Sequence, residues 1–70
     1  MDLVTGAAGH LGNLLVRELL AQGRRVRALV LRGEPLRSLS GLDVELVEGN
    51  VLDVDSLQQA MRGVEVVYHL

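Results

Sequence analysis

Short apolar runs alternate with amphipathic stretches along the whole of this 70-residue chain. Each apolar run is only a few residues long and rich in valine and leucine, and a glycine or a polar residue follows most of them. This pattern predicts β-strands. The runs are Leu3–Thr5, Val26–Leu31, Val44–Val47 and Val64–Leu70. The second run is almost continuously apolar, which is typical of a strand covered on both faces.

The stretch at residues 10–22, between the first two runs, has the spacing of an amphipathic helix. Its apolar positions recur at helical intervals, while Arg17 and Glu18 lie elsewhere on the predicted surface. These apolar positions are Leu11, Leu14, Leu15, Leu19 and Leu20. Gly23 stands where a left-handed helix cap belongs, so we expect the helix to end there.

Two further helical segments are predicted. Glu34-Pro35 opens a short helical turn, with Pro35 at the first helical position and Gly41 closing it. Asp53 is a favourable N-cap for a helix over residues 54–62. Its buried stripe is expected to comprise Leu57, Ala60 and Met61, with Gly63 as the stop.

The resulting order is β-α-β-α-β-α-β, which predicts an α/β fold with a Rossmann-like parallel sheet and right-handed crossovers. We expect the strand order 3-2-1-4. The first two crossovers then step in one direction and place their helices on one face. The third steps back past the first strand and places residues 54–62 on the other face.

Three glycines, Gly6, Gly9 and Gly12, lie at intervals of three between the first strand and the first helix. Gly6 can adopt the positive φ of a tight turn. Gly9 leaves room for a ligand at the helix N-terminus, where unpaired N–H groups and the helix dipole favour a phosphate. Gly12 allows the helix to lie close to the strand beneath it. The alternative is a tight turn that binds nothing, but the strand before and the helix after it favour dinucleotide binding.

Composition narrows the class of protein. Tyr68 is the single aromatic residue and the net charge is −2, which argues against a nucleic-acid partner. There is no cysteine, which excludes disulfides and thiolate metal sites. No signal-like segment opens the chain, and no apolar run approaches the length of about 18 residues that a membrane span needs. We therefore expect a cytoplasmic protein without membrane contact.

The chain resembles the extended short-chain dehydrogenase/reductases, which include nucleotide-sugar epimerases and dihydroflavonol-reductase-like enzymes. The resemblance covers the whole chain and rests on four segments in the family's order: VTGAAGHLG, GRRVRALV, LVEGNVLD and GVEVVYHL. It implies a Rossmann fold that binds NAD or NADP. By this similarity the glycines form the pyrophosphate loop, and the backbone of His10 and Leu11 follows the phosphates. Asn50 and Val51 would flank the adenine, and Leu70 would approach the nicotinamide side.

Two residues depart from the family pattern. Asn50 stands where the family usually has Asp, so a contact to the adenine amino group depends on the amide orientation. His10 stands where Phe or Tyr is common, and its side chain is either a partly exposed lid on the turn or a phosphate ligand. His69 is interpreted as a packed strand residue rather than a ligand.

Arg32 bears on the form of the cofactor. In NAD-binding proteins of this fold, an acidic residue at the end of the second strand, about 20 residues past the glycine loop, usually accepts from the ribose hydroxyls of the adenosine. Here no acid occurs until Glu34, and Arg32 can pair with a 2′-phosphate. The alternative is a solvated loop arginine, since many NADP-binding relatives have the arginine one position earlier, where this chain has Leu31. The sequence therefore leans towards NADP.

The family's catalysis uses a Tyr-x-x-x-Lys pair, and this chain contains no lysine. We therefore expect residues 1–70 to be the N-terminal, non-catalytic part of a dinucleotide-binding domain from an NAD(P)-dependent reductase or epimerase. Two alternatives are a non-catalytic dinucleotide-sensing regulator and a minimal Rossmann folding unit without useful cofactor affinity. The last strand is a free apolar edge, so the isolated chain is expected to form a homodimer.

Overall fold

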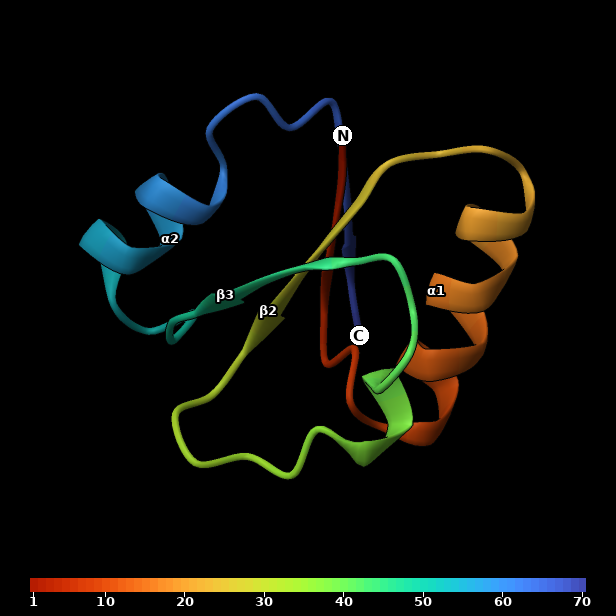
Figure 1. Cartoon of the computed structure of the whole chain (residues 1–70). Coiled ribbons are helices and arrows are strands. Elements are labelled where there is room, and N and C mark those ends of the chain that lie inside the picture. The colour runs from red at the N-terminus through yellow and green to blue at the C-terminus, as the bar shows by residue number, and fades with distance from the viewer.

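The computed structural model describes all residues, 1–70, as a four-stranded parallel sheet with helices on both faces (Figure 1). The strand order is β3-β2-β1-β4 and all three pairings are parallel, which confirms the predicted topology. The elements in chain order are β1 (Asp2–Thr5), α1 (His10–Ala21), β2 (Val26–Val30), the 3₁₀ helix η1 (Arg37–Leu39), β3 (Glu45–Glu48), α2 (Val54–Ala60) and β4 (Val66–His69).

The register of the sheet brings the carboxyl ends of the strands to one edge. Thr5, the last residue of β1, pairs with Leu29 on β2 and with His69 on β4. Val30 at the end of β2 pairs in turn with Glu48 at the end of β3. The loops that leave β1, β2 and β3, and Leu70 after β4, therefore begin along this edge, where open parallel sheets bind their ligands.

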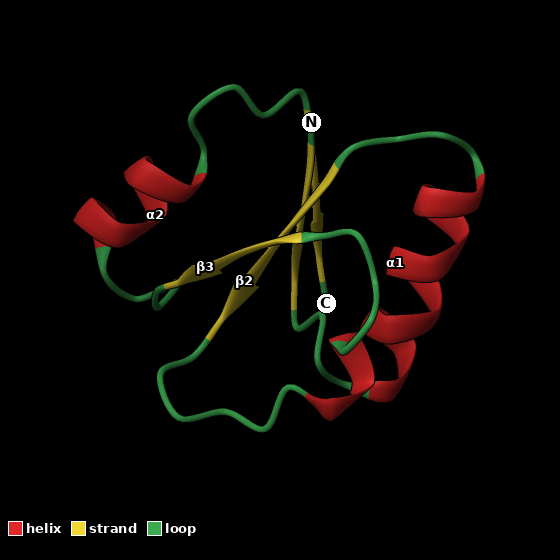
Figure 2. Ribbon diagram, in the orientation of Figure 1, coloured by secondary structure: helices red, strands yellow, loops and turns green.

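The two faces of the sheet are covered by different elements, as Figure 2 shows, with α1 and η1 on one side and α2 on the other. The larger core lies under α1 and η1 and comprises Val4, Ala7, Val16, Leu19, Val26, Ala28, Val30 and Leu39. The smaller core lies under α2 and comprises Leu3, Leu29 and Ala60. The predicted division of the crossover helices between the two faces is confirmed.

The face that α1 buries differs from the predicted leucine stripe. Gly12, Val16 and Leu19 are its buried residues, whereas Leu11 and Leu14 are 66% and 52% exposed. These buried positions follow the i, i+4, i+7 spacing of a single helix face. Because Gly12 lies against the glycine turn, that face is fixed towards the sheet and two of the leucines turn outwards.

The connection between β2 and β3 also differs from the prediction. Its helical turn begins at Arg37, so Pro35 lies before it rather than at its first position. Leu39 is only 4% exposed and anchors η1 in the larger core. The segment therefore takes its position from the burial of Leu39 rather than from the preference of proline for a helix start.

Several boundaries shift by one or two residues. β1 begins one residue before the predicted Leu3, and β2 ends at Val30 rather than Leu31. β3 spans Glu45–Glu48 rather than Val44–Val47, and β4 spans Val66–His69 rather than Val64–Leu70.

The predicted helix over residues 54–62 ends at Ala60. Asp53 is its N-cap as predicted, and its side chain accepts from the N–H of Asp55. At the other end, Nη1 of Arg27 donates to the carbonyl oxygens of Ala60 at 2.7 Å and Arg62 at 2.6 Å. An arginine from β2 thus satisfies carbonyls that the helix end leaves free. Met61 was expected to be buried but is 40% exposed.

An ion pair between a buried aspartate and an exposed arginine joins the start of β1 to the segment after α1. The carboxyl group of Asp2 is 1% exposed and accepts from Nε of Arg24 at 2.9 Å and from Nη2 at 2.6 Å. These hydrogen bonds hold the pKa of Asp2 below its usual range, outweighing burial, which acts to raise it. The same contact raises the pKa of Arg24, so both groups are charged around neutral pH.

Candidate functional site

The turn after β1 is built on Gly6, which has a φ of +66°. Its carbonyl oxygen accepts from the N–H of Gly9 at 3.1 Å and closes the turn. A Cβ atom at this position would lie 3.2 Å from the carbonyl oxygen of Leu70, the residue after β4. Gly6 is therefore required both by its backbone conformation and by the close approach of the chain end beyond β4.

Gly12 is required for a different reason. A Cβ atom here would overlap the carbonyl oxygen of Gly6 and lie 2.8 Å from Cα of Ala7. Gly12 was predicted to allow close packing of the helix on the strand, but the close approach is to the backbone of the turn at Gly6 and Ala7. This packing holds the first turn of α1 beside the carboxyl end of β1.

Gly9, by contrast, is not required by the chain's own packing. Its φ of −76° and ψ of 171° are extended values open to any residue. An added Cβ atom would meet only the carbonyl oxygen of Gly6, at 3.4 Å. The space next to Gly9 is therefore open on the solvent side of the turn.

The N-terminus of α1 carries unpaired donors. Gly9 is the N-cap and supplies no side-chain cap, and the first turn contains no acidic residue. The first helical hydrogen bond is donated by Asn13 to the carbonyl of Gly9, at 2.9 Å. The N–H groups of His10, Leu11 and Gly12 have no acceptor within the chain. Together with the positive end of the helix dipole, these three donors can hold an anion.

Two adjoining hollows extend along the carboxyl edge of the sheet from this turn. The first, of about 150 Å³, is lined by Thr5, Gly6, Leu29, Leu31, Glu34, Gly49, Val51, His69 and Leu70. The second, of about 510 Å³, is lined by Leu31, Arg32, Glu48, Gly49, Asn50, Asp53 and Ser56. They share Leu31 and Gly49. The predicted residues Gly6, Val51 and Leu70 thus line one hollow, and Arg32 and Asn50 line the other.

Arg32 lies at the tip of a turn that Glu34 closes. The N–H of Glu34 donates to the carbonyl of Leu31 at 3.1 Å, and a carboxylate oxygen of Glu34 accepts from the N–H of Leu31 at 3.2 Å. Gly33 supplies the positive φ of this turn, +79°. Arg32 forms no ion pair and is exposed, while Glu48 and Asp53 line the same hollow.

The amide orientation of Asn50 follows from its hydrogen bond to the backbone. Its Oδ1 accepts from the N–H of Leu52 at 2.9 Å, which leaves both donors of Nδ2 free. The hydroxyl of Ser56 accepts from the N–H of Asn50 at 3.1 Å and fixes the backbone. At the preceding Gly49, a Cβ atom would lie 2.8 Å from Cδ1 of Leu29, so that side chain would have to shift to admit a larger residue.

Thr5 ties the end of β4 to the end of β1. Its Oγ1 lies 2.7 Å from Nδ1 of His69 and accepts from the N–H of Leu70 at 3.2 Å. His69 is exposed and lines the smaller hollow, so it is not the packed strand residue expected from the sequence. A threonine ending a strand is common, and sequence reasoning gave it no role.

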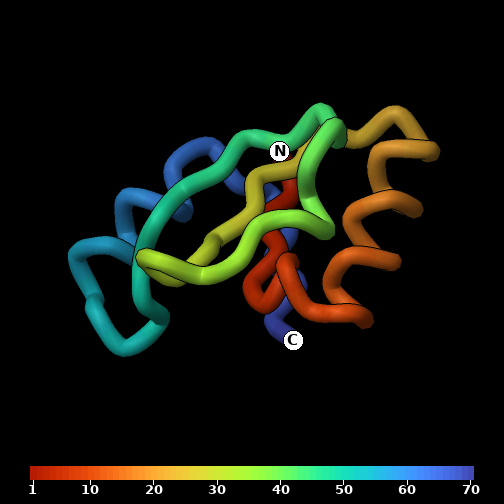
Figure 3. Tube along the Cα trace, turned by 60° about the horizontal axis from the view of Figure 1, so that its bottom comes forward, coloured from red at the N-terminus to blue at the C-terminus, as the bar shows by residue number.

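Sequence reasoning also missed Ser38, which connects η1 to the glycine turn. Its hydroxyl donates to the carbonyl oxygen of Ala8 at 2.9 Å, and its own carbonyl accepts from Nδ2 of Asn13. Figure 3 shows the segment after β2 passing beside the turn after β1. A serine thirty residues away in sequence from its acceptor carries no local signal of this contact.

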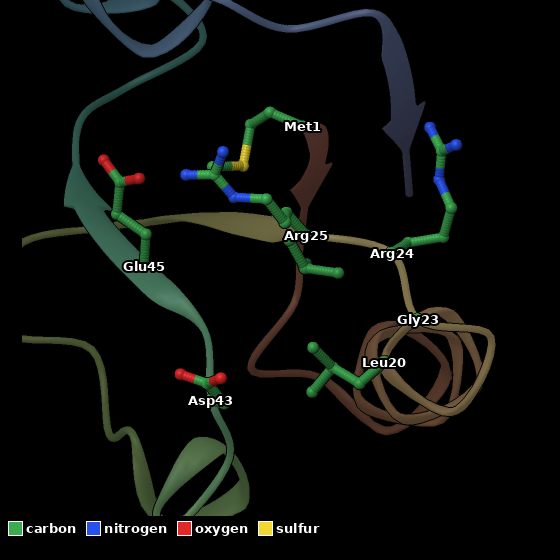
Figure 4. Close-up of a pocket in the computed structure, with 8 residues that line it drawn as sticks. Met1, Leu20, Gly23, Arg24, Arg25, Asp43 and Glu45 are labelled. Atoms are coloured by element: carbon green, nitrogen blue, oxygen red, sulfur yellow. The ribbon is translucent and has the colours of Figure 1, made fainter.

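A third hollow, of about 420 Å³, lies at the opposite, amino end of the strands (Figure 4). Its lining residues are Met1, Leu20, Gly23, Arg24, Arg25, Val26, Asp43 and Glu45. In Figure 4, Arg25 extends on the side of Glu45, whereas Arg24 turns the other way, where it pairs with Asp2. None of the predicted site residues lines this hollow, and parallel α/β sheets bind ligands at the carboxyl edge.

Nowhere in the chain is there a helix with the length and apolar character needed to cross a membrane. No group of three or more His, Cys, Asp or Glu side chains is placed to hold a metal ion.

Comparison with known proteins gives matches over nearly the whole chain. The family model described as "NmrA-like family" matches residues 3–70. Sterol demethylase protein B of Methylococcus capsulatus is 51% identical over 67 residues, which cover 96% of this chain and 20% of that protein.

Two solved structures extend this similarity. A short-chain dehydrogenase/reductase superfamily protein from Agrobacterium tumefaciens, solved with bound NAD, is 44% identical with a TM-score of 0.79. The alignment covers 100% of this chain and 20% of that one. A nucleoside-diphosphate-sugar epimerase from Pseudomonas aeruginosa is 28% identical with a TM-score of 0.91, covering 99% of this chain and 23% of that one.

The chain therefore spans about a fifth of the length of the relatives it matches. The resemblance inferred from the four sequence segments is confirmed by these matches and by the strand order of the sheet. On this evidence the chain belongs to the NmrA-like family of extended short-chain dehydrogenase/reductases.

Proposed function

We propose that this chain binds NAD or NADP along the carboxyl edge of its sheet, as the N-terminal dinucleotide-binding part of a reductase or epimerase. The observation that carries the proposal is the set of three unpaired N–H groups at His10, Leu11 and Gly12. The first turn of α1 contains no acidic residue, and Gly9 supplies no side-chain cap. The NAD bound to the Agrobacterium relative supports the same class of ligand.

In this proposal the pyrophosphate lies against the first turn of α1, in the open space beside Gly9. Two phosphate groups require donors and tolerate no bulky side chain at this position, which explains a glycine that the fold itself does not demand. The exposed side chain of His10 covers the turn from outside. Leu70, whose backbone lies beside Gly6, is on the nicotinamide side.

The adenine lies next to Asn50 and Val51. Because Oδ1 of Asn50 already accepts from Leu52, the free Nδ2 group is the part of the side chain that can reach the base. An amide donor suits a ring nitrogen of adenine, whereas the aspartate usual in the family can only accept. The change from Asp to Asn thus alters which atom of the base is bound.

Arg32 supports NADP as the form of the cofactor. The Leu31–Glu34 turn presents its guanidinium, free of any ion pair, beside the same hollow as Asn50. A guanidinium can contact a 2′-phosphate through two donors. It has to outweigh Glu48 and Asp53, which line this hollow and repel an additional phosphate.

The chain holds a cofactor in this proposal but does not itself complete the reaction. It contains no lysine, so it has no Tyr-x-x-x-Lys pair. Its contribution is to bind the pyrophosphate and to orient the adenine and nicotinamide ends.

A titration with NADH and NADPH tests the proposal. We expect Gly9→Val to abolish measurable binding of both cofactors, because the branched side chain occupies the phosphate position. The far-UV circular dichroism should remain largely unchanged, since Gly9 has ordinary backbone angles. The control is Ala21→Val, an exposed substitution at the other end of α1. Wild-type affinity in Gly9→Val would show that the glycine serves only the turn.

Arg32→Ala tests the cofactor form separately. We expect it to lower the affinity for NADPH by about tenfold or more, because a hydrogen bond to a charged group contributes about 1.5–3 kcal/mol. The affinity for NADH should change much less. Arg37→Ala, which removes another exposed arginine from the same connection, is the control. An equal loss for NADH and NADPH would make Arg32 an ordinary loop residue.

We also propose that the isolated 70-residue chain forms a two-fold dimer, through β4 or through the less covered α2 face of the sheet beside it. This strand pairs only with β1, so its outer edge has unpaired N–H and C=O groups. Val66, Val67 and Leu70 on and beside it are 38%, 43% and 49% exposed. A free apolar edge favours pairing with the same edge of a second copy.

A further inference from the structure

We propose that Ser38 is a positioning residue of the dinucleotide site: its hydroxyl fixes the Ala8–Gly9 peptide and thereby aims the first turn of α1 at the pyrophosphate. This inference rests on the proposed function and concerns a residue outside the glycine motif. Ser38 lies on η1, in the connection between β2 and β3.

The Ala8–Gly9 peptide group is held from both of its sides. Its carbonyl oxygen accepts from the Ser38 hydroxyl at 2.9 Å, and its N–H donates to the carbonyl of Gly6 at 3.1 Å. Because a peptide unit is planar, these two hydrogen bonds together determine its orientation. The N–H groups of the next three residues are the unpaired donors of the site, so their direction depends on this plane.

Gly9 makes such a restraint necessary. A residue with a Cβ atom resists the rotation of the preceding peptide into positive φ, whereas glycine populates both signs of φ about equally. The missing Cβ atom at Gly9, which leaves room for a phosphate, therefore also removes one restraint on the backbone of the turn. The hydroxyl of Ser38 replaces the restraint that a side chain at Gly9 would have supplied.

Ser38 is itself held firmly enough to do this. Its neighbour Leu39 is buried in the larger core, and its carbonyl accepts from Nδ2 of Asn13 on α1. Oδ1 of Asn13 in turn accepts from Nε of Arg17 at 3.0 Å, which fixes the amide orientation. The segment that carries Arg32 is thus joined to the glycine turn and to α1 by one set of hydrogen bonds, and both ends of the adenosine diphosphate would be positioned together.

The test compares the binding of NADH and NADPH by four variants. We expect Ser38→Ala to lower the affinity for both cofactors by about threefold to tenfold, which is the effect of losing one hydrogen bond. Ser38→Thr keeps a hydroxyl and should restore most of the affinity. Ser40→Ala removes an exposed serine that makes no side-chain hydrogen bond, just after η1, and should bind like the wild type.

Leu39→Val separates positioning from loss of stability. This substitution removes a buried methyl group and so destabilises the same segment, while the hydroxyl of Ser38 is kept. Amide exchange at Gly9, followed by NMR without cofactor, gives a second readout. We expect faster exchange in Ser38→Ala than in Leu39→Val at equal unfolding free energy.

The outcomes distinguish the two proposals. If the wild-type chain binds neither NADH nor NADPH, the proposed function fails. The role of Ser38 alone is overturned if the wild type binds and Ser38→Ala binds equally well. It is also overturned if Leu39→Val, at the same unfolding free energy as Ser38→Ala, loses as much affinity as that variant.

Discussion

The two faces of the sheet differ in how many apolar side chains they bury. On the α1 face, eight buried residues form one cluster, and η1 closes it at the carboxyl edge. On the α2 face only three residues are buried, and Val54 and Met61 of the covering segment are 66% and 40% exposed. The α1 face carries the glycine turn and the unpaired donors. The three donors that the proposed function uses therefore lie on the better-packed side, while the α2 face and β4 carry more exposed apolar side chains.

The comparison can be tested most directly with a matched pair of leucines. Leu19 on α1 is 5% exposed, and Leu57 on α2 is half-buried. We expect Leu19→Ala to lower the free energy of unfolding by about 3 kcal/mol and Leu57→Ala by about 1 kcal/mol, because the former leaves a cavity in a closed core. Urea unfolding followed by circular dichroism measures both. Equal losses would mean that the two faces contribute alike to stability.

Acid unfolding tests the ion pair that fastens the α1 side to the start of β1. The pKa of Asp2 is lower in the folded chain than its ordinary value of 3.8. Its contribution to stability is therefore fully present above that value and is lost as the pH falls through the folded pKa. We expect unfolding free energy to fall below about pH 4 in the wild type.

Asp2→Asn is the matched variant for the acid measurement. It keeps the size of the side chain and removes the titrating group, so stability should be lower at neutral pH and should depend less on pH in the acid range. A wild-type acid slope in this variant would show that other carboxyl groups account for it.

The smallest expected effect concerns the outer edge of β4. Val66→Lys places a charge on the free edge of β4 and should shift the chain from dimer to monomer in sedimentation equilibrium at tens of micromolar. Arg62→Lys keeps the charge of an exposed residue near the same side and is the control. A wild-type chain that sediments as a 7.6 kDa monomer and melts cooperatively would contradict the dimer.

The site shows a similar division between what local sequence predicts and what it does not. Gly6, Gly9 and Gly12 were predicted from their spacing between a strand and a helix, and the structure separates their roles. Gly6 and Gly12 are demanded by the fold, and Gly9 is left open. Thr5 and Ser38 were not predicted, because each acts through a hydrogen bond to a residue distant in sequence.

The sequence by itself determined the order of elements, the parallel sheet and its strand order, because these follow from local periodicity, turn residues and the handedness of crossovers. Only the tertiary structure decided which side of α1 is buried, since the contact of Gly12 with the turn fixes the helix rotation. It likewise decided where η1 begins, through the burial of Leu39, and where α2 ends, through the hydrogen bonds of Arg27. Such choices depend on partners brought close by the folded backbone, and neither hydrophobic spacing nor residue preference contains that information.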